Sequence, residues 1–421
     1  MVGIIGKAAE LATLFLLAVV VPRVLGPEAY GVFAVALTVV TLGSMAMTLG
    51  GPTLLARYVP AAEPAERVAL ARALSIRLAR GRAAHLLVLG LLVSAVVATD
   101  PERFPLLVTA LVLASLALNV AAALALQLQL GLGRTLAWTM RYPLQNAVRV
   151  AAVLVLHDRW GAVGGVVAIL LSALTAFALG VLAARPVLRL RLPSVPLPDG
   201  ALRFGVVAAA GGALSQTAHR GGIIAVALLA GSAVQTGYAA LAIGVALAAT
   251  YAVVQLFTVS LPELARRTSA DTAAGEAVLR QLAGALVGVL LPATLGVALL
   301  LDRLVPLAFG PSYAAAAAAF GPALALVVLA PLTAMAPQVA ALRLQPTATL
   351  YSALAGVLTV VVVAVATVPA WGALGATAAT AAGAAVNATA AMVALPGAFG
   401  PRLAGASLAG AALVAAVAAV S

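Results

Sequence analysis

Three polar side chains fall inside an otherwise apolar stretch of the sequence. Arg220 lies well away from both ends of the predicted helix 202–230, with Gln216 one turn before it on the same face and His219 beside it. A guanidinium group forms paired, charge-assisted hydrogen bonds to phosphate oxygens. The trio therefore predicts a site for an anion such as a diphosphate. The alternative is a buried structural pair between Arg220 and a carboxylate or carbonyl group of a neighbouring helix.

A second polar row recurs every four residues in the predicted helix 138–157. Arg141, Gln145 and Arg149 share one helical face, with Asn146 beside them. Arg149 lies about 12 Å further along the axis than Arg141, at 1.5 Å per residue. The row predicts a polar lining for a cavity, whereas Arg141 alone is equally explained as a residue that sets membrane topology.

Glu10 is the carboxylate that we place well inside a predicted helix, 3–25. It is a candidate for coupling to a proton or sodium gradient, and the alternative is a local pair with Lys7, three residues away. Arg23, near the end of the same helix, is a further candidate for substrate binding. Ionisable groups at membrane depth are costly and usually face the interior of a bundle or water.

Several function classes find no support. The chain has no cysteine, and Lys7 stands outside any phosphate-binding loop. His85, His157 and His219 lie in separate segments without metal-ligand spacing. We therefore expect no enzymatic activity, no cofactor and no bound metal. The net charge of +12 reflects arginines in cytoplasmic loops, so we expect no nucleic-acid partner.

The composition is that of an integral membrane protein. Of the 421 residues 64% are hydrophobic and 9% are charged, and the mean hydropathy is +1.16. A spanning helix needs roughly 20 apolar residues, and such runs follow one another almost end to end. We predict an all-α protein with 12–13 transmembrane helices, at 3–25, 30–57, 84–99, 104–132, 138–157, 161–184, 202–230, 235–261, 280–301, 312–342, 348–369, 371–395 and, as the thirteenth, 402–420.

Two similar turns indicate two halves of similar plan. The polar turn Pro22–Gly31 separates two apolar runs, and a related turn returns at Ala230–Ala239, about 205 residues later. We predict two pseudo-symmetric six-helix lobes around a central cavity, related by an axis along the membrane normal. The predicted parts are an N-terminal lobe 1–184, a cytoplasmic linker 185–201, a C-terminal lobe 202–395 and a further helical stretch 396–421.

Arginine placement predicts the orientation. With the N-terminus inside, most loop arginines face the cytoplasm, including those of 58–83, 185–201 and 262–279. The basic loop within 65–82 also carries regularly spaced apolar residues. It fits either a segment lying on the inner leaflet or a solvated loop.

The turns resemble a known family. Leu25-Gly26-Pro27-Glu28-x-Tyr30-Gly31, a helix ending near Gly50-Gly51, and Val305–Tyr313 with its phenylalanine-glycine-x-x-tyrosine turn are similar to the polysaccharide-transporter branch of the multidrug/oligosaccharidyl-lipid/polysaccharide exporter superfamily. The resemblance covers nearly the whole chain in layout. The third and fifth predicted helices are shorter than in that family, and the chain stops within or just after the thirteenth helix.

The resemblance implies a flippase of the bacterial cytoplasmic membrane for surface polysaccharide synthesis. It would move polyprenyl-diphosphate-linked oligosaccharides by alternating access, amid membrane lipid and beside glycosyltransferases or a polymerase. One alternative is a cation-coupled multidrug antiporter of the same superfamily, which would be expected to carry acidic residues in its cavity. The deep charges here are two arginines against one glutamate, which favours an anionic substrate. Another alternative is a non-transporting scaffold, in which a deep arginine would matter only for folding or partner binding.

Overall fold

The structure is a computed structural model in which the described part is helical and contains no strand. Eight of its helices are long and apolar enough to cross a membrane. The all-α membrane fold predicted from the sequence is confirmed. The predicted span 84–99 lies outside the described residues, which are 2–48, 50–51, 54–55, 58–59, 62–81, 105–190, 195–197, 199–267, 272–343 and 345–420.

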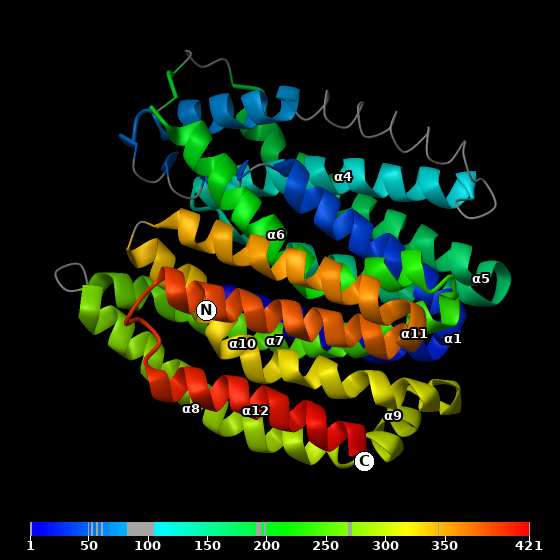
Figure 1. Cartoon of the computed structure of the whole chain (residues 1–421). Coiled ribbons are helices and arrows are strands. Elements are labelled where there is room, and N and C mark those ends of the chain that lie inside the picture. The colour runs from blue at the N-terminus through cyan, green and yellow to red at the C-terminus, as the bar shows by residue number, and fades with distance from the viewer. Residues whose placement is uncertain are drawn as a thin grey trace. The chain divides into compact units, whose positions relative to one another are not determined.

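The labelled helices follow one another along the chain as Figure 1 shows. Their bounds are α1 (Val2–Thr48), α4 (Leu106–Gly131), α5 (Thr135–Leu188), α6 (Ala201–Leu229), α7 (Ala233–Arg267), α8 (Thr272–Ala298), α9 (Leu301–Phe309), the 3-10 helix η1 (Pro311–Ala316), α10 (Ala317–Leu342), α11 (Pro346–Ala394) and α12 (Pro401–Val420).

Three of these helices each consist of two helical segments, separated by one glycine with a positive φ. Gly26 breaks α1 at φ 71°, Gly161 breaks α5 at φ 48° and Gly372 breaks α11 at φ 51°. This backbone region is accessible to glycine at little cost. The turn predicted around Pro22–Gly31 is confirmed, and the other two breaks fall next to the predicted helix boundaries.

Two basic segments are more helical than predicted. The segment 262–279 was expected to be a loop, yet α7 continues to Arg267 and α8 starts at Thr272. Alanine and glutamate, which favour helices, fill the start of α8. Within 65–82, residues 67–81 form a helix whose Leu70 and Leu74 pack into a core with Leu55 and Leu128. Its apolar face is therefore covered by protein.

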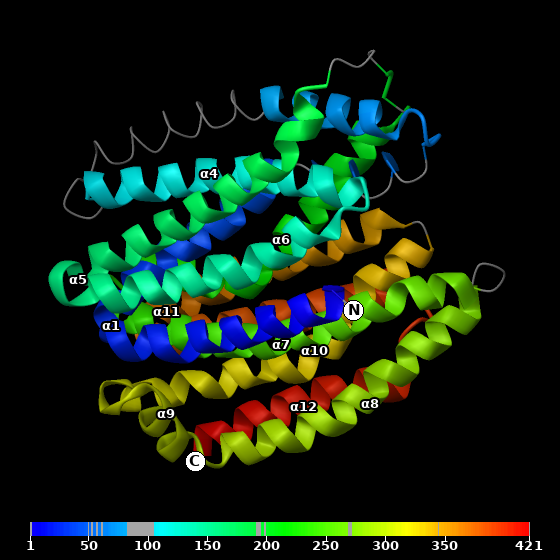
Figure 2. The same ribbon diagram turned by 180° about the vertical axis from the view of Figure 1, so that it is seen from behind.

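The chain divides into two compact units. Unit 1 comprises Met1–Leu17 and Ala36–Ala213, and unit 2 comprises Ala18–Val35 and Leu214–Ser421. In unit 1, α4 lies along both halves of α5 (Figure 2). The predicted lobe boundaries and the cavity between the lobes stay predictions.

Helix α10 forms the centre of unit 2, where it contacts α7, α8, α11 and α12 (Figure 1). Most residues of α10 are buried. It is apolar on all sides, as expected of a helix surrounded by others. The core of this unit joins Phe257, Met335 and Phe399 from three different segments.

Candidate substrate-binding site

The polar row predicted on α5 exists and is buried in unit 1. Arg141, Gln145 and Arg149 are each less than a tenth exposed. Arg141 Nε donates to Gln145 Oε1 at 3.1 Å. Gln145 Nε2 and Arg141 Nη2 both donate to Asn119 Oδ1 of α4, at 3.1 and 3.5 Å. The row therefore ties α5 to α4.

Arg149 is bound by neutral acceptors. Its Nε and Nη2 donate to Ser172 Oγ at 3.3 and 3.0 Å, and its Nη1 donates to Asn146 Oδ1 at 3.4 Å. Asn146 Nδ2 in turn donates to Thr13 Oγ1 of α1 at 3.4 Å. We call Asn119, Arg141, Gln145, Asn146, Arg149 and Ser172 the α5 cluster. It links α5 to α4 through Arg141 and Gln145, and to α1 through Asn146.

Arg220 lies on α6 in unit 2 and is bound differently. The side chain is partly buried, and its Nε is buried without a hydrogen-bond partner in the described part of the chain. Its electrostatic neighbour is Tyr30 of α1. The Tyr30 hydroxyl lies against Gly244 of α7, since a Cβ on that glycine would be 3.5 Å away. No hydrogen bond of this hydroxyl occurs among the described residues. Arg220 Nε and the Tyr30 hydroxyl thus both have unused hydrogen-bonding capacity in the described part of the chain.

The other residues predicted beside Arg220 lie on the same helix. Gln216 is partly exposed, and His219 is buried with its Nδ1 2.6 Å from the Ser215 carbonyl oxygen. His219 is therefore held by its own helix, most simply with Nδ1–H donating. The structure brings Gln216 and Arg220 to consecutive turns of α6, as predicted.

Glycines place α6 tightly against α11. A Cβ on Gly221 would lie 3.1 Å from Val360, and one on Gly222 would meet the Ala376 carbonyl group. Close approach of this kind is the usual role of small residues in membrane helices. The backbone directly after Arg220 is consequently fixed, which limits where its side chain can reach.

The repeated turns pack reciprocally within unit 2. A Cβ on Gly31 would meet the Ala233 carbonyl oxygen, and one on Gly237 would meet that of Pro27. Both members of one contact are 206 residues from their counterparts in the other. The internal repeat read from the sequence is thus expressed as a pair of equivalent contacts.

The third turn of the family resemblance joins the same place. Tyr313 donates from its hydroxyl to the Pro22 carbonyl oxygen at 3.1 Å, and Tyr238 donates to that of Ser312 at 3.1 Å. The rings of Tyr238 and Tyr313 meet edge to face at 6.1 Å. The residues that carry the resemblance therefore build the helix ends that hold Tyr30.

Two predicted site residues stand apart. Arg23 is exposed near the Gly26 turn, and Glu10 is buried on α1 with 5% exposure. Sequence reasoning missed Asn119 and Ser172, which accept hydrogen bonds from the predicted arginines, and Tyr30, the electrostatic neighbour of Arg220. Tyr30 was noted as a turn residue, and nothing in its local pattern pointed to Arg220.

Comparison with known proteins decides the family. Residues 3–266 match the family model described as polysaccharide biosynthesis protein. The chain belongs to this family. A search of curated proteins finds no match.

Solved structures of similar fold are membrane transporters. The lipid II flippase MurJ in an inward closed conformation aligns with a TM-score of 0.74 and 10% identity, over 98% of this chain and 91% of that one. The Vibrio cholerae MATE transporter VcmN in its bent form aligns with a TM-score of 0.61 and 16% identity, over 94% of this chain and 96% of that one. A MOP-superfamily transporter from Pyrococcus furiosus aligns with a TM-score of 0.57 and 15% identity, over 99% of this chain and 94% of that one. The chain therefore shares the fold of these membrane transporters.

Proposed function

We propose that the chain flips a polyprenyl-diphosphate-linked oligosaccharide across the bacterial cytoplasmic membrane by alternating access. Glycosyltransferases of a surface-polysaccharide pathway would supply the substrate, and a polymerase would use it. The family description and the fold shared with a lipid II flippase support this proposal. The substrate class rests on the chain's own residues.

The observation that carries the proposal is the free hydrogen-bonding capacity at Arg220. A guanidinium group offers five N–H donors in a planar fork, and Arg220 Nε is buried with no partner among the described residues. An intramembrane arginine that pairs with no protein carboxylate is costly. A diphosphate would neutralise its charge and fill its donors, with the Tyr30 hydroxyl as a second donor. Gln216, one turn away, would contact the adjoining sugar.

The predicted site residues Arg149 and Gln145 belong to the α5 cluster. We assign the charge of Arg149 a longer-range role in binding the same substrate. Within the described part of the chain, the hydrogen bonds of Arg149 all go to neutral groups, so its positive charge is not cancelled locally. Its field would attract the anionic headgroup without direct contact. Arg23, exposed near the Gly26 turn, would act on the headgroup at one membrane surface.

The test is flipping of a fluorescent undecaprenyl-diphosphate sugar in proteoliposomes with equal amounts of each variant. Charge-assisted hydrogen bonds contribute about 1.5–3 kcal/mol, so Arg220→Ala should lower the flipping rate roughly 10- to 150-fold. Arg220→Lys should recover part of the rate, because it keeps the charge and loses the fork. Arg203→Ala, an exposed arginine of the same helix, is the control and should flip at the wild-type rate.

Three outcomes separate the alternatives. A wild-type rate in Arg220→Ala would remove this residue from the site. An Arg220→Ala protein that fails to accumulate in the membrane would indicate a structural role. Export of cationic drugs by the wild-type protein, without flipping of the lipid-linked sugar, would favour the antiporter alternative.

Glu10 is proposed as the ion-coupling residue, because it is a buried carboxylate on α1. If it carries a proton or sodium ion, Glu10→Gln should abolish the stimulation of flipping by an imposed ion gradient. The rate without a gradient should remain. Equal stimulation in the variant and the wild type would refute the assignment.

A further inference from the structure

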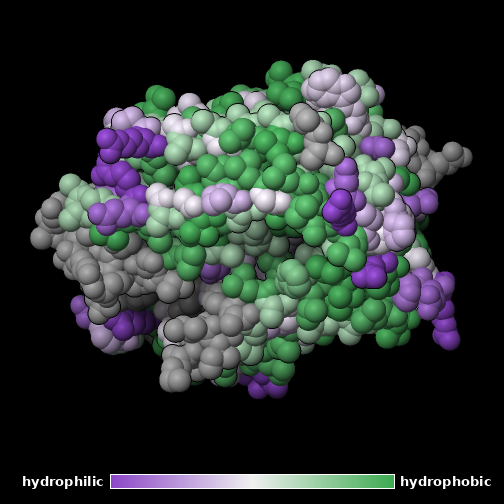
Figure 3. All heavy atoms as spheres, turned by 90° about the horizontal axis from the view of Figure 1, so that it is seen from below, coloured by the Kyte–Doolittle hydropathy of each residue, from purple (hydrophilic) through white to green (hydrophobic). Residues whose placement is uncertain are grey.

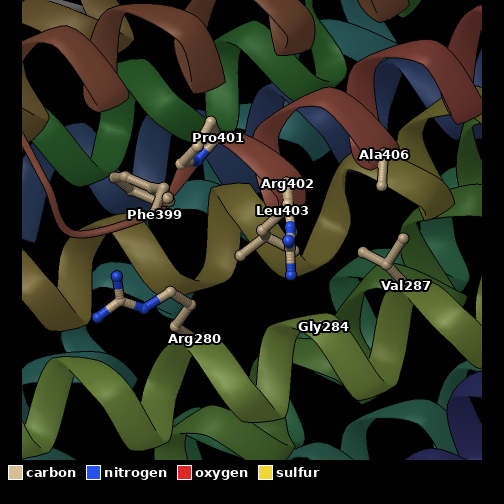
Figure 4. A pocket seen from close by; sticks show the side chains of 9 residues that line it. Arg280, Gly284, Val287, Phe399, Pro401, Arg402, Leu403 and Ala406 are labelled. Carbon is tan, nitrogen blue, oxygen red and sulfur yellow. The ribbon is translucent and has the colours of Figure 1, made fainter.

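A pocket lies between α8 and α12 in unit 2, away from Arg220. It has a volume of about 490 Å³. Arg280, Gly284 and Val287 line it from α8, while Arg402, Leu403 and Ala406 line it from α12 (Figure 4). Phe399 and Pro401 close it where the chain enters α12. The lining thus combines two cations with an apolar floor.

The two arginines are not neutralised by a carboxylate in the described part of the chain. The nearest acidic residue along α8, Glu276, is already bound by Arg343 through two hydrogen bonds of 2.6 and 2.8 Å. These bonds raise the pKa of Arg343 above its ordinary value. Arg280 Nη1 donates to the Gly397 carbonyl oxygen at 3.3 Å, which leaves its other N–H groups available. Arg402 is exposed.

Next to the two arginines, the surface of α8 that lines the pocket is apolar. Among the described residues, no atom beyond the adjoining backbone of α8 lies within 4 Å of a Cβ built on Gly284 or on Gly288, one turn later, so this side of α8 is open. Figure 3 shows hydrophobic residues over much of the middle of the visible face, with hydrophilic ones gathered towards its two ends.

We propose that this pocket binds an anionic phospholipid of the surrounding membrane. Its phosphate would lie between Arg280 and Arg402, because guanidinium groups bind phosphate oxygens in pairs. One acyl chain would run along α8 past Gly284 and Val287. The bound lipid would join α12 to α8 and so stabilise the C-terminal end of unit 2. The site does not depend on the proposed transport substrate.

The role of the two arginines can be tested by titrating the detergent-solubilised protein with phosphatidylglycerol and measuring the bound lipid by native mass spectrometry. Each arginine near a membrane surface changes the affinity for anionic lipid about fivefold. Arg402→Gln should therefore weaken phosphatidylglycerol binding about fivefold, and adding Arg280→Gln should weaken it further. Arg303→Gln, an exposed arginine of α9, is the control and should bind as the wild type. Equal binding of phosphatidylcholine and phosphatidylglycerol by the wild-type protein would overturn the proposal.

The apolar part of the pocket can be tested without changing a charged residue. Gly284→Leu would place a side chain in the pocket, and Gly296→Leu would place one in open space on the same helix. Both replace glycine by a better helix former. Gly284→Leu should lose the increase in thermal stability that phosphatidylglycerol gives the wild type, and Gly296→Leu should keep it. If both variants keep it, or if inorganic phosphate alone stabilises the protein equally, a lipid does not occupy this pocket.

Discussion

The α5 cluster and the site around Arg220 each contain an arginine inside a membrane-spanning helix, and they differ in how the N–H groups of that arginine are bound. Arg149 in unit 1 has its donors filled by Ser172 and Asn146, which belong to the same helix as Arg149. Arg220 in unit 2 has a buried Nε with no partner among the described residues. Neither arginine is paired with a carboxylate in that part of the chain.

This difference separates an arginine whose hydrogen bonds go to the protein from one with a donor available for a ligand. Satisfied polar networks fix the positions of the helices that they join. A donor left open in the apo protein costs free energy unless a ligand or water fills it. Arg149 should therefore matter mainly for stability, and Arg220 mainly for transport.

The largest expected effect on stability is that of Arg149→Ala. The variant leaves Asn146 Oδ1 without its donor and opens the space between the two halves of α5, which should cost about 1–3 kcal/mol. Its thermal midpoint in detergent should fall by several degrees, whereas that of Arg220→Ala should stay within about one degree, because Arg220 makes no hydrogen bond among the described residues. Arg149→Lys is the control and should lie between. Equal midpoints for both alanine variants would erase the distinction between the two sites.

A smaller loss of stability is expected from Ser172→Ala, since this removes one acceptor while the charge of Arg149 remains. Ser172 Oγ accepts from two guanidinium nitrogens and donates to the Ile169 carbonyl oxygen. Its loss should cost about 1 kcal/mol. Ser115→Ala is matched, because Ser115 is equally buried in unit 1 and, among the described residues, its hydroxyl donates to the Leu111 carbonyl oxygen of its own helix α4. Denaturation curves that shift equally for both variants would show that Ser172 does not hold Arg149.

Local patterns predicted the helices and their breaks well. Glycine and proline marked the turns at Gly26 and Gly231, where the backbone does adopt a positive φ. The four-residue spacing placed Gln145 and Arg149 on one face correctly. The segment 262–279 was mistaken for a loop because its charges resembled a solvated stretch, although its alanines favour a helix.

The partners of the arginines could not be predicted from the sequence. Asn119 reaches Gln145 across the contact of α4 with α5, and Tyr30 approaches Arg220 from a helix about 190 residues earlier in the chain. Such pairs depend on how helices pack, which the apolar pattern of each helix does not specify. Tyr313 illustrates the same limit, since its bond to Pro22 joins segments 291 residues apart.

The smallest expected effect, and the sharpest probe of the Arg220 site, is Tyr30→Phe. The ring stacks on Phe33 at a centroid distance of 6.0 Å, and the substitution keeps this contact. Because the hydroxyl has no hydrogen-bond partner among the described residues, its loss should leave the thermal midpoint unchanged. A neutral hydrogen bond to the substrate is worth about 0.5–1.5 kcal/mol, so flipping should slow roughly 2- to 10-fold.

In the background of Arg220→Ala, the same Tyr30→Phe change should have less effect, because the two groups would hold one headgroup together. Tyr351→Phe, an exposed tyrosine of α11, is the control for handling and should flip as the wild type. Additive losses in the double variant would mean that Tyr30 acts separately from Arg220. A lowered midpoint in Tyr30→Phe would mean that the hydroxyl stabilises the fold, and the contrast between the open and the filled arginine site would then be lost.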